Sequence, residues 1–312
     1  MKTYVCGADV GGTTVKLGIF KTTGELLKEW EIPTRTEEGG KAILPDISQA
    51  IDTALAELGI AKADVEGLGI GVPGPVLSDG TINKAINLNW GVFNIVEKME
   101  ALSGLRVKAG NDANVAALGE MWQGGGEGCK NIVMVTLGTG IGAGIIINEH
   151  ILTGANGGAG EAGHMTMEVD EEEVCGCGKK GCFEQYASAN GTVRVARRYL
   201  AAHPEVETVL KADHINSKII FDEAQKGDKA ALAIVDQVSQ YLGRGFANIA
   251  CVVDPEVFVI GGGMSKSGQI LIDGIKKYYK KYVFHASAHT EFRTARLQNR
   301  AGIYGCARML LD

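Results

Sequence analysis

One pattern occurs twice in this chain and limits its possible folds more than any other feature: a glycine-rich turn between two apolar segments. The first copy is VGGTTVKLGIF at residues 10–20, and the second is LGTGIGAGIII at residues 137–147. The copies share few identities but have the same shape, because in both the glycines join segments rich in apolar and β-branched residues. The repeat predicts two similar halves, each presenting a glycine hairpin.

The remaining elements fit two α/β halves. Apolar runs that end at glycine or proline predict strands at residues 3–10, 13–20, 26–32, 66–74, 105–110, 131–152 (broken by its glycine turn) and 255–263. Helical spacing of apolar residues predicts helices at residues 44–60, 93–104, 112–122, 187–203, 217–227, 228–253, 268–283 and 301–311. A chain of 312 residues is long for one core. We therefore expect two domains, with the last helix packed back on the N-terminal half.

Composition excludes several classes of protein. The hydrophobic share of 45% and the charged share of 22% are those of an ordinary globular chain. A net charge of −6 argues against broad electrostatic binding to nucleic acid or to an anionic membrane. No apolar run reaches the ~18 residues of a membrane span, and the opening MKTYVCGADV enters a strand rather than a leader. We expect a cytoplasmic protein.

The two hairpins are candidate phosphate sites. In ADVGGTT, residues 8–14, the glycines expose successive backbone N–H groups, Thr13 and Thr14 add hydroxyl donors, and Asp9 could reach a Mg²⁺ through waters. A plain hairpin turn is the alternative. The second hairpin holds a loose G-x-G-x-x-G string, but a strand follows it instead of a helix. This excludes a dinucleotide-binding fold and leaves a second phosphate hairpin.

A third glycine loop, IGGGMS at residues 260–265, follows a predicted strand. Its bare backbone could accept a nucleoside. The alternative is an ordinary helix N-terminus with Ser265 as its cap.

The segment GNDAN, residues 110–114, joins a predicted strand to a predicted helix. Asp112 is either a helix N-cap or a general base on a rigid element, and phosphoryl transfer to an alcohol needs such a carboxylate. The amide of Asn111 has both a donor and an acceptor, which suits a polyol.

Three cysteines and a histidine form the pattern His164-x10-Cys175-x-Cys177-x4-Cys182. This cluster has three other interpretations: a redox pair, a disulfide and a nucleic-acid-binding zinc knuckle. The spacing is not the C-x2-C of a redox pair, and thiols in the cytoplasm stay reduced, which argues against a disulfide. A single cluster on an acidic chain argues against an array of nucleic-acid-binding zinc fingers. Three thiolates and an imidazole match a closed, structural Zn²⁺ site.

Two further features accompany this pattern: a pair of carboxylates and an acidic run. Glu161, His164 and Glu184 would be drawn together by the metal, and such groups suit hydroxyl recognition. The alternative for Glu184 is a carboxylate in the first turn of a helix. The run DEEE at residues 170–173 is expected to be a solvated charged surface.

Taken in order, these motifs resemble the ROK family of sugar kinases and repressors, and within it the ATP-dependent glucokinases of Gram-positive bacteria. The resemblance covers essentially the whole chain, through DVGGTTVKLGIF, VPGPV, INLNW, GNDANVAALGEMW, VTLGTGIGAGIIINE, GAGEAGHM, CGCGKKGCFEQYAS and VFVIGGGMSKSG. It implies an α/β, actin-like ATPase (ribonuclease H-like) fold of two similar domains around a central cleft. The expected domains are residues 1–111 with a C-terminal helix at about residues 301–312, and residues 112–300, which carry the zinc site.

The resemblance also implies roles for individual residues. Asp112 is the expected catalytic base, and the expected sugar-binding residues are Gly74, Asn111, Asp112, Glu161, His164 and Glu184. The expected ATP and Mg²⁺ site consists of Asp9, Gly11, Gly12, Thr13, Thr14, Lys16, Gly138, Thr139 and Gly140, with Gly261, Gly262 and Gly263 beside the adenosine. A structural Zn²⁺ on His164, Cys175, Cys177 and Cys182 would fix the sugar-binding edge.

The implied function is that of an ATP-dependent glucokinase, in which Asp112 accepts the proton of the glucose 6-hydroxyl as that oxygen attacks the γ-phosphorus of MgATP. A kinase for mannose, fructose or an N-acetylhexosamine is the alternative, because small loop changes could admit another sugar. A non-catalytic sugar sensor is less expected, since a repressor carries a DNA-binding domain and only eight residues precede Asp9. Glucose and ATP are the implied partners, and the implied assembly is a homodimer.

Overall fold

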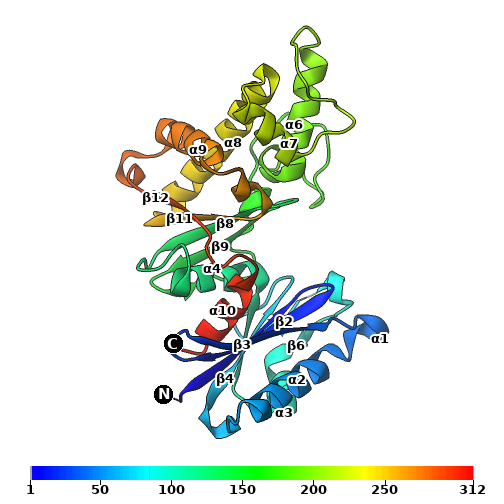
Figure 1. Ribbon diagram of the computed structural model, residues 1–312, viewed down its shortest axis with the longest axis vertical. Helices are drawn as coiled ribbons and strands as arrows, with labels where there is room; N and C mark the ends of the chain where they lie inside the picture. Colours follow the sequence, from blue (N-terminus) through cyan, green and yellow to red (C-terminus); the bar gives the residue numbers. More distant parts are fainter. Residues whose placement is uncertain (1, 84, 312) are drawn as a thin grey trace. The chain divides into compact units, whose positions relative to one another are not determined.

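The structure is a computed structural model that describes residues 2–83 and 85–311 (Figure 1). Its strands are β1 Tyr4–Val10, β2 Thr14–Lys21, β3 Leu26–Pro33, β4 Val65–Val72, β5 Thr81–Ile82, β6 Phe93–Asn94, β7 Val107–Asn111, β8 Ile132–Leu137, β9 Ile141–Ile147, β10 His150–Ile151, β11 Val257–Gly261 and β12 Glu291–Thr294. Its α-helices are α1 Glu37–Gly40, α2 Ile43–Glu57, α3 Ile95–Ser103, α4 Asp112–Gln123, α5 Glu184–Ala187, α6 Ala189–Ala202, α7 Ser217–Gln225, α8 Lys229–Val253, α9 Gln269–Tyr282 and α10 Ala301–Arg308.

The two glycine hairpins occupy equivalent places in two sheets. The first sheet has the strand order β3-β2-β1-β4-β7, and the second has the order β10-β9-β8-β11-β12. In each sheet the strands joined by the glycine turn are the second and third, followed by two strands from later in the chain. In the first sheet β1 and β2 are antiparallel, while β4 and β7 run parallel to β1. This common topology confirms the prediction of two similar α/β halves.

The chain divides into two compact units. Unit 1 comprises Met1–Ile132, Gly144–Gly160 and Ala295–Asp312, and unit 2 comprises Val133–Ala143 and Glu161–Thr294. These limits differ from the predicted boundary after Asn111, because α4 packs closely along α10 and so belongs with unit 1. The predicted domain boundaries stay a prediction.

In unit 1 the strands present glycines toward α10. A Cβ at Gly69 would lie 1.8 Å from the Cys306 carbonyl oxygen, and one at Gly7 would lie 2.3 Å from the Ile303 carbonyl oxygen. Cys306 Sγ in turn lies 3.2 Å from the Ala8 carbonyl oxygen. Helices α2 and α3 cover the opposite face of the sheet (Figure 1). The core on this side consists mostly of buried aliphatic side chains. The C-terminal helix therefore packs on the N-terminal half, as predicted.

Replacing Gly305 by alanine is expected to lower the free energy of unfolding by about 3 kcal/mol, the upper end of the usual range for overpacking. Its Cβ would lie only 1.5 Å from the Val115 carbonyl oxygen, so α10 and α4 would have to separate. Gly91→Ala is the matched control, because the new methyl group would meet no atom within 4 Å. Urea unfolding of both variants measures the difference. Equal stability of the two variants would contradict the close packing of α4 on α10.

In unit 2 the long helix α8 packs against α9, α7 and α6. The helix predicted at residues 187–203 is in fact two helices, α5 and α6. Ser188 ends the first and caps the second, since its side chain accepts a hydrogen bond from the Gly191 backbone N–H at 2.9 Å. The short strands β5, β6 and β12 were not predicted. Among the described residues, no helix has the length and apolarity needed to cross a membrane.

Candidate functional site

The first glycine hairpin lies in unit 1 between β1 and β2. Gly11, Gly12 and Thr13 form its exposed tip, and the Gly11 N–H donates to the Thr14 carbonyl oxygen at 3.0 Å. Asp9 and Lys16 face each other across the two strands. Lys16 Nζ donates to the Asn299 carbonyl oxygen at 3.1 Å, just before α10. The hairpin thus presents open backbone beside one carboxylate and one ammonium group.

Asp9 lies against the start of α10, since a Cβ at Gly302 would be 2.2 Å from its Oδ2 atom. Burial, and then the neighbouring charge of Asp112, raises the pKa of Asp9 to about 6, while Lys16 opposes the shift. A half-buried carboxylate whose pKa is raised, beside the exposed backbone of the hairpin, suits a hard divalent cation held through waters. The residues present therefore fit Mg²⁺.

Asn111 and Asp112 join β7 to α4 in unit 1. Asn111, not Asp112, is the N-cap: its Oδ1 accepts from the backbone N–H groups of Ala113 at 3.0 Å and Asn114 at 3.2 Å. Asn111 Nδ2 donates to the Gly74 carbonyl oxygen at 3.1 Å, which ties the PGP loop (residues 73–75) to the start of α4. Asp112 is exposed in the first helical turn, where its Oδ1 accepts from the Ala113 N–H at 2.8 Å. The cap role considered for Asp112 falls to its neighbour, and the Asp112 side chain is exposed.

The second glycine hairpin lies in unit 2 between β8 and β9. The Gly138 N–H donates to the Gly140 carbonyl oxygen at 3.0 Å, and Thr139 is exposed at the tip. A shallow hollow of about 340 Å³, open to solvent, is lined by Gly138–Gly142 of this hairpin, Thr136 and Glu184. A Cβ at Gly140 would lie 2.5 Å from Glu184 Oε2, so the carboxylate needs the bare backbone at this position. The hairpin and a predicted sugar-binding carboxylate thus line one open hollow.

The third glycine loop lies beside the second hairpin. Gly262 has a φ of +83°, and a Cβ there would lie 2.5 Å from the Leu137 carbonyl oxygen at the end of β8. Ser265 is not a helix cap, because its hydroxyl donates to the Gly262 carbonyl oxygen at 2.7 Å and α9 begins only at Gln269. The Gly261, Gly262 and Gly263 loop therefore borders the same edge of the second sheet as Gly138.

The four predicted metal ligands come together in unit 2. The candidate ligand atoms of His164, Cys175, Cys177 and Cys182 all lie within 4.8 Å of one another. The Cys177 and Cys182 sulfurs are 3.6 Å apart, and Cys175 Sγ is 3.8 Å from His164 Nδ1. Neighbouring sulfurs around a tetrahedral Zn²⁺ are about 3.8 Å apart when each Zn–S bond is about 2.3 Å. The geometry and the soft donor set therefore fit zinc.

Burial affects the thiols of this cluster differently. It raises the pKa of Cys175 and of Cys182, both of which are buried. The pKa of exposed Cys177 is lowered, mainly by a hydrogen bond from the Lys179 backbone N–H. Lys179 Nζ also donates to the His164 carbonyl oxygen at 2.9 Å. A bound cation would compensate the thiolates that burial disfavours.

Glu161, His164 and Glu184 lie together at the edge of the cysteine cluster, as the spacing predicted. His164 Nε2 is 3.9 Å from Glu161 Oε2, and Nδ1 is 3.6 Å from Glu184 Oε1. Cys175 Sγ is only 3.0 Å from Glu184 Oε1. The two ring nitrogens of His164 therefore face different groups: Nδ1 faces the thiols and Nε2 faces Glu161. One imidazole can serve a metal and a polar ligand at once.

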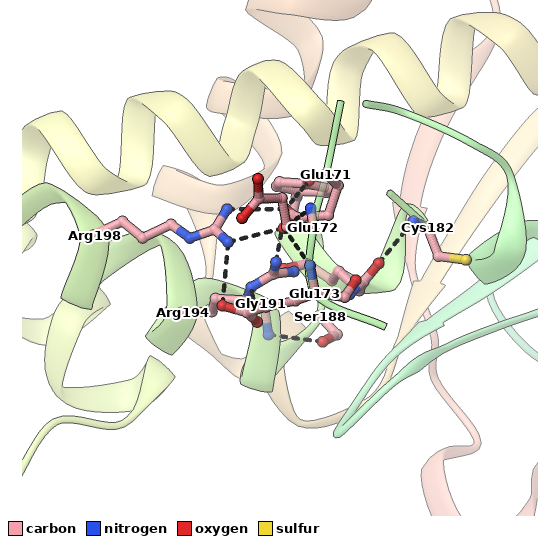
Figure 2. Close-up of polar contacts among 10 residues, drawn as sticks. Glu171, Glu172, Glu173, Cys182, Ser188, Gly191, Arg194 and Arg198 are labelled. Carbon is pink, nitrogen blue, oxygen red and sulfur yellow. Dashed lines mark hydrogen bonds and ion pairs between the residues drawn. The ribbon is translucent and has the colours of Figure 1, made fainter. Parts of the chain in front are cut away.

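The expectation that residues 170–173 form a solvated charged surface is wrong for Glu171. Its side chain is only 4% exposed and pairs with Arg198 at 2.9 Å and with Arg194 at 2.6 Å (Figure 2). The Tyr186 hydroxyl donates to the same carboxylate. These contacts hold the pKa of Glu171 well below its usual range. The two arginines lie on α6, so no local sequence signal marked the partnership.

The candidate residues thus form one group in each unit. Unit 1 holds the first hairpin with Asp9 and Lys16, together with Gly74, Asn111 and Asp112. Unit 2 holds the second hairpin, the third glycine loop, the cysteine cluster, and the pair Glu161 and Glu184. Within each unit the side chains predicted to act together lie near one another.

Comparison with known proteins gives a consistent result. Residues 5–312 match the ROK family. A glucokinase of Halalkalibacterium halodurans is 43% identical, and the alignment covers 97% of this chain and 93% of that protein. A glucokinase of Streptomyces coelicolor is 37% identical, and the alignment covers 96% of this chain and 95% of that protein. A solved ROK family glucokinase from Streptomyces griseus, in complex with glucose and AMPPNP, is 34% identical, covers 98% of both chains and has a TM-score of 0.71. This match bears out the expected actin-like ATPase fold.

Proposed function

Because this chain belongs to the ROK family, we propose that it is an ATP-dependent glucokinase that forms glucose 6-phosphate and ADP. The observation that carries the proposal is the open hollow of about 340 Å³ that Glu184 shares with the second glycine hairpin. A hairpin of bare N–H groups suits a phosphate, and a carboxylate suits sugar hydroxyls. Donor and acceptor recognition therefore meet in one place.

Asp112 is the proposed general base. It stands exposed in the first turn of α4, on a backbone that the Asn111 cap holds rigid. Its carboxylate accepts the proton of the glucose 6-hydroxyl as that oxygen attacks the γ-phosphorus in line with the leaving ADP oxygen. Asn111 also holds Gly74 through its amide, so the sugar-binding PGP loop and the base share one support.

The phosphate groups of ATP are the proposed ligands of the two hairpins. Backbone N–H groups near Gly12 and Gly140, with the hydroxyls of Thr13 and Thr139, stabilise the charge on the phosphate oxygens. Mg²⁺, when bound, neutralises phosphate charge, and Asp9 is the residue that would hold it through waters. Lys16 supplies a fixed positive charge next to Asp9.

The cysteine cluster is the proposed holder of a structural Zn²⁺, which closes the loop that carries the sugar-binding side chains. Four ligands leave no open position for water, so the chemistry falls to the side chains around it. His164 Nε2 and the carboxylates of Glu161 and Glu184 bind sugar hydroxyls. A homodimeric assembly and a cytoplasmic location complete the proposal.

A coupled ADP-release assay with MgATP and a panel of hexoses tests this function. We expect turnover with glucose at a kcat/KM well above that with mannose, fructose or N-acetylglucosamine. Turnover restricted to another hexose would change the assigned substrate and leave the proposed mechanism in place. Sugar binding without turnover on any hexose would overturn the kinase assignment and leave a sensor.

Gly140→Ala is expected to weaken glucose binding by about tenfold, the order of loss seen when a supporting contact is removed. The new methyl group displaces the flexible end of Glu184 and leaves the fold intact, because only that side-chain oxygen lies within 3 Å. Gly138→Ala is the matched change in the same hairpin, since its Cβ would meet no atom closer than 4.0 Å. Calorimetric titration with glucose in the absence of ATP separates the two variants. Equal glucose affinities would place Glu184 outside the sugar site.

A further inference from the structure

The buried carboxylate of Glu171 is the centre of an ion cluster, which we name the Glu171 cluster and define as Glu171, Glu173, Tyr186, Arg194 and Arg198. Figure 2 shows the two glutamates and the two arginines. Arg198 donates to both oxygens of Glu171, at 2.9 Å and 3.0 Å. The backbone N–H groups of residues 172 and 173 donate to Glu171 Oε1 at 2.9 Å and 3.0 Å. Two arginines and two glutamates balance in charge.

The contacts of Arg194 are ion pairs more than aligned hydrogen bonds. Its Nη2 lies 2.6 Å from Glu171 Oε2 and its Nε lies 2.7 Å from Glu173 Oε2, yet neither N–H points straight at its partner. The buried Glu171–Arg194 pair is weak evidence for stability because desolvation offsets most of the attraction, and the pair with exposed Glu173 adds little. The cluster therefore calls for a role other than simple stabilisation, and its neighbours indicate one.

Helix α5 is a single turn that connects this cluster to Glu184. A helix of four residues does not form alone and must be held from outside. The Tyr186 hydroxyl binds Glu171. Gln185 Nε2 donates to the Glu173 carbonyl oxygen at 3.1 Å, and Arg194 Nη1 donates to the Gln185 carbonyl oxygen at 3.3 Å. Both residues that follow Glu184 are thus bound by the cluster.

The cysteine cluster holds the same turn from its other side. The Cys182 N–H donates to Gln185 Oε1 at 3.0 Å, and Cys182 is also one of the four proposed metal ligands. The turn that carries Glu184 therefore lies between two supports of different chemistry. One support needs a metal, whereas the other consists only of side chains of this chain.

We propose that the Glu171 cluster is a second positioning device for Glu184, which acts through Tyr186 and Gln185 and fixes the sugar-binding carboxylate independently of the metal. Glu171 and Tyr186 are positioning residues and touch no substrate. The role in sugar binding rests on the proposed function, whereas the control of α5 does not.

The same loop offers a matched control. Glu168 Oε1 pairs with Arg244 Nη2 at 2.9 Å, and this arginine also donates to the Met167 carbonyl oxygen at 2.8 Å. This Glu–Arg pair ties the loop to α8, and within the described part of the chain neither side chain makes a hydrogen bond or ion pair to α5. Glu168→Gln therefore removes an ion pair of the same loop and leaves the hydrogen bonds of the turn that carries Glu184 in place.

The test compares Tyr186→Phe, Glu171→Gln, the double variant and Glu168→Gln. We expect each of the first two changes to raise the Kd for glucose by about tenfold, with bound zinc unchanged and kcat within about twofold. The double variant is expected to bind glucose no more weakly than the poorer single variant, because both changes cut one connection. Glu168→Gln is expected to keep the wild-type Kd. Tyr186→Phe loses a single hydroxyl, so the test stands even where Glu171→Gln folds poorly.

Unchanged glucose affinity in folded, zinc-loaded Tyr186→Phe protein would overturn the proposal. So would fully additive effects in the double variant, or an equal loss in Glu168→Gln. If the wild-type protein neither binds nor phosphorylates a sugar, the proposed function fails, and amide exchange at residues 184–187 then decides the positioning role alone. Faster exchange there in Tyr186→Phe than in Glu168→Gln supports it, and equal exchange contradicts it.

Discussion

Asp112→Asn is expected to lower kcat by about three orders of magnitude, within the 10²- to 10⁴-fold range of a general base, and to leave the Kd for glucose nearly unchanged. The amide keeps the size of the carboxylate but cannot accept the hydroxyl proton. The Asn111 cap that starts α4 is intact in this variant, so the backbone keeps its place. Steady-state kinetics with MgATP and a separate glucose titration measure the two effects.

The control for this change is Asp46→Asn. Asp46 also lies in the first turn of a helix of unit 1, where it pairs with Arg35 at 2.5 Å. Asp46 resembles Asp112 in its place near a helix start but has no proposed role in the reaction. The kcat of Asp46→Asn should therefore match that of the wild-type protein. A kcat of Asp112→Asn within tenfold of the wild-type value would show that Asp112 serves the helix and not the reaction.

Cys182→Ser is expected to remove most of the bound zinc, with a loss of metal affinity of at least about 100-fold, the upper end of what supporting residues of metal sites cost. Cys182 is fully buried, and its backbone N–H holds Gln185. Serine fills nearly the same space, so the loss reflects the ligand and not the packing. Because metal binding and folding of a closed site are coupled, the melting temperature should fall as well.

Metal analysis of the purified protein and a thermal melt, each with and without a chelator, provide readouts that do not depend on activity. Cys251→Ser is the control, since that cysteine is exposed on α8 outside the cluster. The zinc content of Cys251→Ser should stay at about one ion per chain, as a closed site of four protein ligands predicts. Full zinc retention by Cys182→Ser would contradict the proposed ligand set.

The parts of the fold that the sequence predicted are those with a strong local signal. The glycine hairpins were visible because turn residues lie between apolar strands, and the C-terminal helix because of its apolar spacing. Strand β12 was missed because its four residues, EFRT, are half charged and offer no apolar run. The break between α5 and α6 was missed because Ser188 is an ordinary residue whose capping role depends on the Gly191 N–H.

The candidate site follows the same rule. The short spacing of the cysteines around Cys175, with one histidine nearby, predicted the metal ligands. A closed zinc site needs four such thiol and imidazole groups within reach of one ion. Asn111 was identified as a polar site residue, but its capping bonds to α4 became visible only in three dimensions. Glu171 could not be found, because its partner Arg198 lies 27 positions later. A run of acidic residues is usually solvated, and only tertiary packing buries one of its members.

The most direct test of the central claim is the identity of the product. Wild-type protein incubated with glucose and MgATP would be examined by phosphorus and carbon NMR, beside a parallel reaction with 6-deoxyglucose. The account predicts ADP and a phosphate ester on carbon 6, and no phosphate ester from the 6-deoxy sugar. A phosphate on any other hydroxyl, or phosphorylation of 6-deoxyglucose at a comparable rate, would contradict it.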